Sequence, residues 1–320
     1  MENHPPVLGI VVPCYNEQEV IASSIEALSE LLFRLAEQGL VDNKSFIGIV
    51  DDRSKDTTWK LISGISKNNP HIRAIRLAAN RGHQYALLAG LLEFRKDSDC
   101  LVSIDADLQD DAGVIGQMVE KFRQGNDIVF GVRNKRTTDT FFKRTTAYIF
   151  YRFLKILGIN VLHNHADFRL TSRRVNDELE HFSEVNLFLR GIFPLMGFNT
   201  SIVHYARSER TAGTTKYPLK KMISLALDGI TSFSTVPLRI ITVLGFLVFI
   251  ICILLMVYAL WAYLTGRTIA GWFSTVLPFY FLGGIQILCI GIIGEYLGKI
   301  YKEVKRRPRF IVDDRIEGTR

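Results

Sequence analysis

Two long stretches near the C-terminus contain no charged residue, and they limit how this chain can fold more than any other feature. Residues 240–266 and 268–294 are each 27 residues long and are separated by a single arginine. A helix of about 20 apolar residues is long enough to cross the hydrocarbon core of a bilayer. We therefore predict a membrane region over 236–301, with two transmembrane helices at about 240–264 and 275–298.

Basic residues gather directly after the second apolar stretch. The net charge is +7, and residues 297–309 carry six Lys or Arg side chains against one acidic residue, Glu303. The loop between the two stretches carries only Arg267. Because cytoplasmic loops are enriched in basic residues, we expect the basic tail (302–320), the N-terminal domain and both termini in the cytoplasm. A basic tail can also bind nucleic acid, but beside a transmembrane helix we expect anionic lipid headgroups as its partner and no nucleic acid.

Two other segments combine aromatic and basic side chains, as helices that lie in a membrane interface do. They are residues 141–157 and the juxtamembrane segment 216–235. Ordinary packing against a sheet is the alternative for both, and we favour interface contact because an apolar stretch follows so closely. Within the second stretch, Gly294 and Gly298 have the GxxxG spacing that allows close helix contact, so we expect a homo-oligomer.

The first 215 residues alternate short apolar runs with segments of helical periodicity. The apolar runs predict strands at 7–13, 46–50, 72–77, 100–104 and 127–132. Strict alternation of strands and helices indicates βαβ crossovers and a mostly parallel sheet. We therefore assign 1–215 to one α/β domain.

Polar segments follow four of these strands, at 13–17, 51–54, 78–84 and 105–111. In open parallel sheets, ligands bind outside the carboxyl ends of the strands. The segment 80–84 also begins a helix, and the free N–H groups of a helix N-terminus suit an anion. The sequence therefore predicts a polar site at this edge of the sheet.

The segment 103–111, SIDADLQDD, places four aspartates directly after a buried strand. Asp105 and Asp107 can present two carboxylates to one cation, and Gln109 adds an amide oxygen. Mg²⁺ and Mn²⁺ prefer oxygen ligands and often share them with substrate phosphates. We predict that these three residues bind Mg²⁺ or Mn²⁺. The alternative, capping of the next helix, we assign to Asp110 and Asp111.

Five motifs, in this order, resemble those of glycosyltransferase family 2, whose catalytic domain has the Rossmann-like GT-A fold. They are VVPCYNE, VDDRSKD, DADLQD, DFRLTSRR and ERTAGTTKY. The segments DGITSFSTVPLRI and GGIQILCIGIIGEYLGKIYKEVKRRPRF are similar to the membrane part of the bactoprenol glucosyltransferases, a bacterial polyprenyl-phosphate branch of that family. The resemblance implies a GT-A domain followed by a two-helix hairpin in a multi-pass protein of the bacterial inner membrane.

The activity that this resemblance implies is the transfer of one sugar from a nucleotide sugar to a polyprenyl phosphate, with inversion. We expect UDP-glucose as the donor and undecaprenyl phosphate as the acceptor, with UDP-N-acetylglucosamine or GDP-mannose as alternative donors. The product would serve cell-envelope glycosylation, such as O-antigen modification. An ionised lipid phosphate needs little help from a general base, whereas the charge repulsion between two anionic substrates must be offset by cations.

The resemblance also implies which residues contact the substrates. The acceptor phosphate is expected to contact Arg133 and Arg144. The family usually has glycine where Arg53 stands, so the shape of the base pocket is left open. The residues expected to contact the nucleotide sugar are Pro13, Tyr15, Glu17, Asp52, Gly82, Gln84, Asp105, Arg210, Lys216 and Tyr217.

Two aspartates are expected to be catalytic. Asp107 would act through the metal, and Asp167 would act as a base or position the acceptor. For Asp167 the alternative is an ion pair with Arg169 or Arg133.

Two other functions compete with this one. A processive polysaccharide synthase of the same fold would be expected to carry a QxxRW motif, but none of Trp59, Trp261 and Trp272 follows an arginine. A noncatalytic membrane scaffold would not need the carboxylates at the strand ends. Binding of UDP without transfer to lipid would favour the scaffold.

Overall fold

The computed structural model describes residues 4–133, 165–182, 184, 189–206, 236–265 and 272–318. The chain divides into two compact units. The first consists of Met1–Arg144, Val161–Lys216 and Arg307–Arg320, and the second of Thr145–Asn160 and Tyr217–Arg306. The predicted interface segments 141–157 and 216–235 lie outside the described residues.

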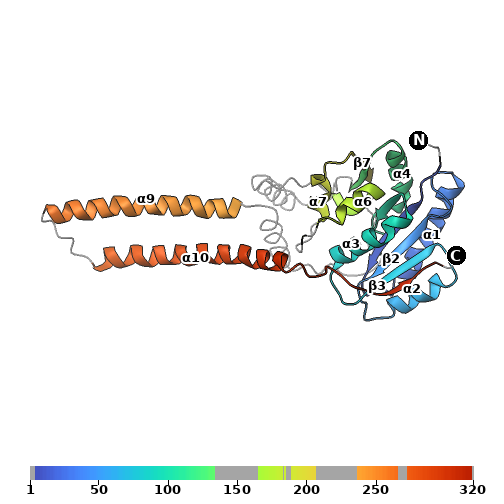
Figure 1. The fold of residues 1–320 in the computed structure, drawn as a ribbon, viewed down its shortest axis with the longest axis horizontal. Coiled ribbons are helices and arrows are strands. Elements are labelled where there is room, and N and C mark those ends of the chain that lie inside the picture. The colour runs from blue at the N-terminus through green and yellow to red at the C-terminus, as the bar shows by residue number, and fades with distance from the viewer. Residues whose placement is uncertain are drawn as a thin grey trace. The chain divides into compact units, whose positions relative to one another are not determined.

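The first unit is built on an eight-stranded sheet with the strand order β7-β5-β6-β4-β1-β2-β3-β8 (Figure 1). Strands β6 and β8 run antiparallel to their neighbours, and all other neighbouring pairs are parallel, so the predicted mostly parallel sheet is confirmed. The strands are β1 Leu8–Cys14, β2 Phe46–Asp51, β3 Ile72–Leu77, β4 Cys100–Ser103, β5 Ile128–Arg133, β6 His165–Ser172, β7 Thr200–Tyr205 and β8 Val312–Ile316.

Helices cover both faces of this sheet, so each central strand is buried on two sides. In β1, Ile10 packs into the cluster that includes α1, α2 and α4, whereas Val11 packs into the cluster that includes α3, α6 and α7. Burial on both faces explains why the strands appear in the sequence as continuous apolar runs. The helices are α1 Ile21–Glu37, α2 Thr58–Ser66, α3 His83–Phe94, α4 Ile115–Arg123, α6 Arg173–Leu179 and α7 Leu189–Leu195, with 3-10 turns at Arg95–Asp97 and Ala112–Val114.

Helix α3 lies unusually close to β1, and one glycine permits it. A Cβ atom on Gly90 would lie 2.4 Å from Cγ1 of Val11. The first turn of α3 is thereby held at the carboxyl edge of the sheet, where the polar segments were expected.

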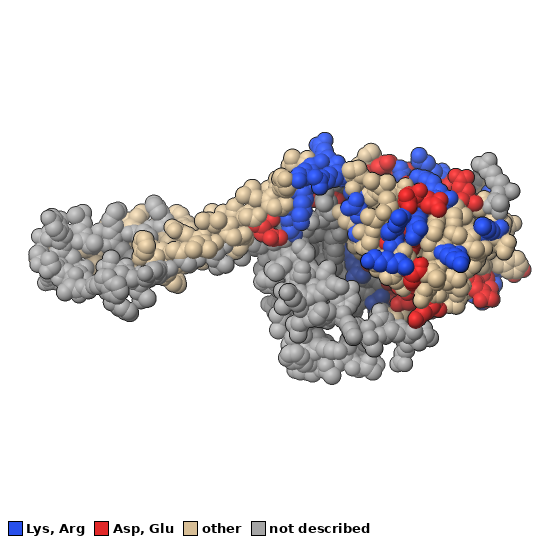
Figure 2. All heavy atoms as spheres, turned by 90° about the horizontal axis from the view of Figure 1, so that it is seen from below, with Lys and Arg blue, Asp and Glu red and all other residues tan. Residues whose placement is uncertain are grey.

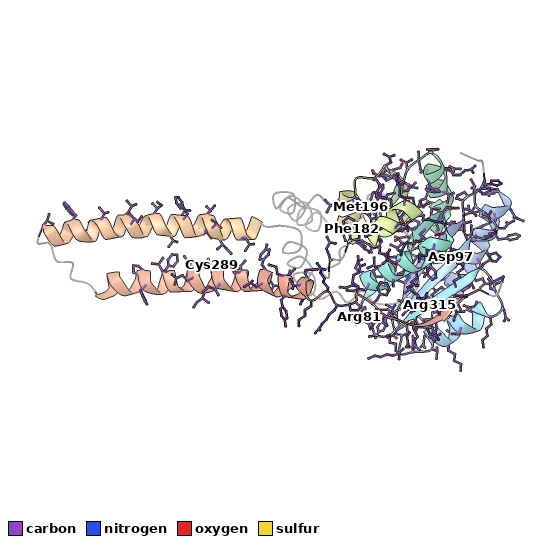
Figure 3. The ribbon with its side chains drawn as sticks, in the orientation of Figure 1. Arg81, Asp97, Phe182, Met196, Cys289 and Arg315 are labelled. Carbon is purple, nitrogen blue, oxygen red and sulfur yellow. The ribbon has the colours of Figure 1, made fainter. Side chains whose placement is uncertain are left out.

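The C-terminal residues return to the sheet instead of ending as a free tail. Residues 312–316, which the sequence analysis included in the basic tail, form the edge strand β8 beside β3. The N–H of Ala78 donates to the carbonyl of Ile311 at 2.8 Å. Arg315 of β8, labelled in Figure 3, pairs with Glu93 of α3 at 2.6 Å. Strand β8 thereby covers β3, which would otherwise be an edge strand open to pairing with other chains.

The second unit contains two long helices, α9 Val236–Leu264 and α10 Trp272–Val304. Both predicted apolar stretches are therefore helical. Within the described part of the chain, one segment, Phe281–Val304, has the length and composition of a membrane-spanning helix. Figure 2 shows Lys and Arg side chains gathered at the C-terminal end of α10, where the chain carries Lys302, Lys305 and Arg306.

Candidate active site

The register of the sheet brings two distant aspartates together. Ser103, the last residue of β4, pairs with Arg169 of β6. Because the strands are antiparallel, Asp105 continues past β4 toward Asp167. His83, the first residue of α3, lies between them, with Nε2 3.7 Å from Oδ1 of Asp105 and 3.5 Å from Oδ2 of Asp167.

Asp167 is buried among donors and cations. Arg169, which is fully buried, donates from Nη2 to Oδ1 at 2.5 Å. Arg190 of α7 donates from Nε to Oδ1 at 3.2 Å and from Nη2 to Oδ2 at 2.9 Å. Gln84 donates from Nε2 to Oδ2 at 3.2 Å, and its own Oε1 accepts from the N–H of Leu189. The expected alternative for Asp167, an ion pair with Arg169, is confirmed.

These contacts set the protonation of the cluster. Burial alone would raise the pKa of Asp167, but the hydrogen bond from His83 and the charges of Arg169 and Arg190 hold this pKa well below its usual range. Burial alone would lower the pKa of His83, but the hydrogen bond to Asp167 and the charge of Asp105 raise it. Asp167 is therefore a stable carboxylate and a weak proton acceptor, which favours a positioning role over a base.

Asp105 is the carboxylate whose environment suits a cation. Burial raises the pKa of Asp105, and although His83 opposes this, the charges of Asp167 and Asp110 add to it. A divalent ion would offset this excess of negative charge. Among the described residues no three His, Cys, Asp or Glu side chains converge on one point. Mg²⁺ often needs only one or two carboxylates, with substrate phosphates completing its shell, so the donors present fit such an ion.

The loop after Asp105 is held by the side chains of Ser24 and Asp107. Ser24 of α1 donates to the carbonyl of Ala106 at 2.6 Å. Oδ1 of Asp107 accepts from the N–H of Gln109 at 3.3 Å, and the Gln109 side chain is buried. Asp107 thus lies beside Asp105 in a short turn, while Gln109 points into the protein.

Asp110 and Asp111 have different roles, although we assigned both to capping. Asp111 does cap the 3-10 turn, because its Oδ1 accepts from the N–H of Gly113 at 2.9 Å. Asp110 is 2% exposed and accepts from Arg133 Nη2 at 3.0 Å and from the Tyr205 hydroxyl at 2.7 Å. The prediction for Asp110 was wrong, because strands β5 and β7 bring a cation and a hydroxyl to it. The alternative partner of Asp167, Arg133, is bound here instead.

Asp52 fixes the loop that precedes α3. Its two oxygens accept from the N–H groups of Arg81 and Gly82, at 2.7 and 2.8 Å. The side chain is 2% exposed, so it faces the loop and not an open surface. Arg81, labelled in Figure 3, and Gly82, whose φ is 91°, form the turn into α3. Asp52, which we expected to contact the nucleotide, supports the loop before α3.

Arg53 takes a backbone conformation that explains why glycine is expected there. Its φ is 61°, in the left-handed region that glycine adopts without cost. Its guanidinium pairs with Asp313 of β8. The side chain therefore joins the turn after β2 to the C-terminal strand.

Three further predicted residues lie at the end of β1 and in the loop that follows it, at the same edge of the sheet. Pro13 is buried in the strand, whereas Tyr15 is 37% exposed just beyond it. The N–H of Glu17 donates to the hydroxyl of Thr58 at 2.9 Å. Arg144, Arg210, Lys216 and Tyr217 lie outside the described residues.

The sequence of residues 9–180, which contains this site, matches the family described as Glycosyl transferase family 2. The chain belongs to glycosyltransferase family 2. Residues 236–300 match a second family, the GtrB C-terminal hairpin. Together with the apolar segment of α10, this match indicates that the family 2 enzyme is associated with a membrane.

Relatives extend over nearly the whole chain. Uncharacterized glycosyltransferase YkoT of Bacillus subtilis (strain 168) is 52% identical over 313 residues, which is 98% of this chain and 93% of the relative. The SfII prophage-derived bactoprenol glucosyl transferase of Shigella flexneri is 38% identical over 310 residues, 95% of this chain and 97% of the relative. The solved structure of glucosyl-3-phosphoglycerate synthase from Mycobacterium tuberculosis is 19% identical, covers 71% of this chain and 78% of its own, and has a TM-score of 0.47. The sequence relatives identify the chain as a glycosyltransferase.

Two residues of this family 2 site were missed by the sequence analysis. His83 stands in the NRGHQ segment, which was read for its backbone N–H groups and not for its imidazole. Arg190 stands on α7, more than twenty residues from Asp167, in a segment that carries no strand-end pattern. Only the fold brings it to the carboxylate.

Proposed function

We propose that this glycosyltransferase moves a single sugar from UDP-glucose to undecaprenyl phosphate, with inversion at C1 of the sugar. The relatives named bactoprenol glucosyl transferase, which match nearly all of this chain, support this choice of acceptor and sugar. UDP-N-acetylglucosamine and GDP-mannose are the alternative donors.

One observation carries the proposal: Arg190 and His83, whose pKa is raised by the hydrogen bond to Asp167 and the charge of Asp105 despite its burial, lie beside the carboxylates of Asp105 and Asp167 at the carboxyl edge of the sheet. Both substrates are anionic where they react, so a site that joins them must supply positive charge. Arg190 supplies it directly, and His83 adds to it when its imidazole is protonated. The carboxylate of Asp105 suits a divalent ion that would supply more.

Asp105, Asp107 and, after a rearrangement of its side chain, Gln109 would hold Mg²⁺ or Mn²⁺. When bound, the ion would neutralise charge on the diphosphate of the departing nucleotide. The loop at Arg81–Gly82, whose two N–H groups donate to Asp52, holds the start of α3 at this edge of the sheet. Pro13, Tyr15 and Glu17 would contact the base and ribose, and the motif residues Arg210, Lys216 and Tyr217 would contact the diphosphate.

The acceptor phosphate would bind to Arg133, with Arg144 as a second contact. Such a monoester carries roughly −1.5 to −2 charges at neutral pH, so its oxygen is already a nucleophile. The low pKa of Asp167 agrees with this, because a carboxylate that binds protons so weakly contributes little as a base. Asp167 would instead position the groups around it.

In this proposal α9 and α10 form the transmembrane hairpin, and both termini and the catalytic domain lie in the cytoplasm. The basic residues at the end of α10 would contact anionic headgroups on that side. The glycine spacing in α10 would support a homo-oligomer.

A pair of neighbouring substitutions tests the reaction and its metal. Asp107→Ala should lower Mn²⁺-dependent transfer of sugar to undecaprenyl phosphate by about 100-fold or more, while the circular dichroism spectrum stays unchanged. Asp111→Ala removes the same charge four residues away, from a cap outside the site, and should keep activity within about threefold. Full activity of Asp107→Ala would refute the metal assignment. Binding of UDP by the wild type without any transfer to lipid would instead favour a noncatalytic scaffold.

A further inference from the structure

Arg190 binds Asp167 through one edge of its guanidinium. Nε lies 3.2 Å from Oδ1 and Nη2 lies 2.9 Å from Oδ2, so two parallel hydrogen bonds fix the plane of the group. A guanidinium has five N–H groups. The other N–H groups of Arg190 have no protein partner among the described residues, and 41% of its side chain is exposed.

The carboxylate of Asp167 does not need Arg190 to be neutralised. Arg169 already pairs with Oδ1 from the buried side, at 2.5 Å, and is itself 0% exposed. Gln84 and His83 contact Oδ2. A purely structural cation in this place would be redundant. The partly exposed position of Arg190 instead leaves half of a planar donor group available to a ligand.

The N–H groups of Arg190 that do not bind Asp167 suit an anion. We expect this anion to lie toward Arg133. Arg133 ends β5, the strand that pairs with β6, and Val132 is in register with His165, two residues before Asp167. Arg133 is held by Asp110 and Arg190 is held by Asp167, so both guanidinium groups are fixed by carboxylates near this end of β6. Each guanidinium has five N–H groups and uses only some of them on its carboxylate, so an anion that reaches both arginines would accept charge-assisted hydrogen bonds from both.

We propose that Arg190 binds the phosphate monoester of the lipid acceptor together with Arg133, and that Asp167 is the positioning residue that orients Arg190 for this contact. The inference rests on the proposed function. In this proposal the two arginines bind the acceptor phosphate. The diphosphate of the donor binds near Asp105 and Asp107. A planar arginine fork matches the oxygens of a phosphate, which a lysine cannot do.

The test separates the two substrates kinetically. Purified full-length protein in detergent is assayed with UDP-glucose, Mn²⁺ and undecaprenyl phosphate, and KM is measured for each substrate. Arg190→Ala should raise KM for undecaprenyl phosphate about tenfold or more, because charge-assisted bonds to phosphate are lost. KM for UDP-glucose should stay within about twofold, as expected for a residue that does not touch the donor. Arg190→Lys, which keeps the charge and loses the fork, should raise the acceptor KM by a smaller factor.

Arg173 provides the matched control. Its side chain is 46% exposed and pairs with one carboxylate, Asp99, at 3.7 Å, but it lies at the opposite end of β6. Arg173→Ala should leave both KM values within about twofold. Inorganic phosphate gives a second readout, since it should compete with the lipid acceptor in the wild type and compete less in Arg190→Ala.

The outcomes are distinct for the two proposals. A wild type that transfers no sugar to any polyprenyl phosphate refutes the proposed function. An active wild type whose Arg190→Ala variant keeps its acceptor KM, or loses affinity for UDP-glucose instead, refutes the acceptor role of Arg190. If Arg190→Ala does not fold, the same comparison made with Arg190→Lys decides the question.

Discussion

Arg133 donates to one oxygen of Asp110 from two nitrogens, with Nε at 3.1 Å and Nη2 at 3.0 Å from Oδ1. The hydroxyl of Tyr205 donates to the same oxygen at 2.7 Å. Burial, together with the hydrogen bond and the charge of Asp110, raises the pKa of Tyr205, so the phenol stays protonated and keeps donating. The third aspartate of the acidic segment thus holds the arginine that the proposed reaction needs.

Replacement of Asp110 should therefore affect both stability and acceptor binding. Asp110→Asn removes the partner of Arg133 and should lower the free energy of unfolding by about 1–3 kcal/mol, less than for a fully buried pair because Arg133 is partly exposed. It should also raise KM for the lipid acceptor. Denaturant unfolding and steady-state kinetics measure the two effects. Tyr205→Phe, which removes one hydrogen bond only, should cost about 1 kcal/mol. Wild-type stability in both variants would contradict this account.

The loop before α3 should depend on Asp52. Asp52→Asn leaves one of the N–H groups of Arg81 and Gly82 facing an amide nitrogen, which should cost about 1–3 kcal/mol and weaken UDP binding. Calorimetric titration with UDP and thermal unfolding measure the two effects. The control is Asp97→Asn, because Asp97 forms an exposed pair with Arg73 at 2.7 Å and should change neither. Equal effects of the two substitutions would show that Asp52 does not hold the loop.

Asp167 should give stability a defined dependence on pH. Because its pKa in the folded protein lies well below the value of about 3.9 in an unfolded chain, the folded state binds the proton less readily. The stabilisation is complete at neutral pH and is lost as the pH falls below about 4 toward the folded pKa. Asp167→Asn leaves Arg169 buried without a counter-charge and should cost about 3–5 kcal/mol at pH 7. The stability difference between wild type and variant should narrow below pH 4, and a difference independent of pH would rule this explanation out.

Two substitutions of Arg53 separate the steric cost of its left-handed backbone from the stabilisation by its ion pair with Asp313. Arg53→Ala keeps a β-carbon in the left-handed region and loses the pair with Asp313, so it should lower stability by up to about 1 kcal/mol. Arg53→Gly loses the same pair but removes the steric cost of about 1–2 kcal/mol, partly offset by the greater freedom of the unfolded chain. The thermal midpoint of Arg53→Gly should therefore exceed that of Arg53→Ala. The reverse order would mean that the backbone conformation is not strained.

Local periodicity was enough to predict the five N-terminal strands and the mostly parallel sheet. Burial on both faces leaves continuous apolar runs, and these can be seen in the sequence. Strand β8 could not be predicted in this way, because its sequence, VDDRI, is polar and pairs only as an edge strand. Asp313 of β8 pairs with Arg53, and Ile311 just before β8 accepts from Ala78, so these contacts join residues more than two hundred positions apart.

In the site, too, some residues could be predicted from the sequence and others could not. Asp105 could be named because it follows a predicted strand, and Asp167 could be named because it stands in a motif that resembles the family. Arg190 could not, since nothing in its own segment points to Asp167, and Asp110 was misassigned because its partners come from β5 and β7. Contacts between side chains of distant strands depend on register, which a single sequence does not determine.

The most direct measurement is the transfer reaction itself. Purified protein is incubated with undecaprenyl phosphate, Mn²⁺ and, in parallel, labelled UDP-glucose, UDP-N-acetylglucosamine and GDP-mannose, and the lipid phase is then extracted and counted. We predict that label from UDP-glucose enters the lipid phase and that this transfer requires the divalent ion. The product should be a sugar that is β-linked to undecaprenyl phosphate. Label that stays in the aqueous phase with all three donors, from protein that still binds UDP, would contradict the account.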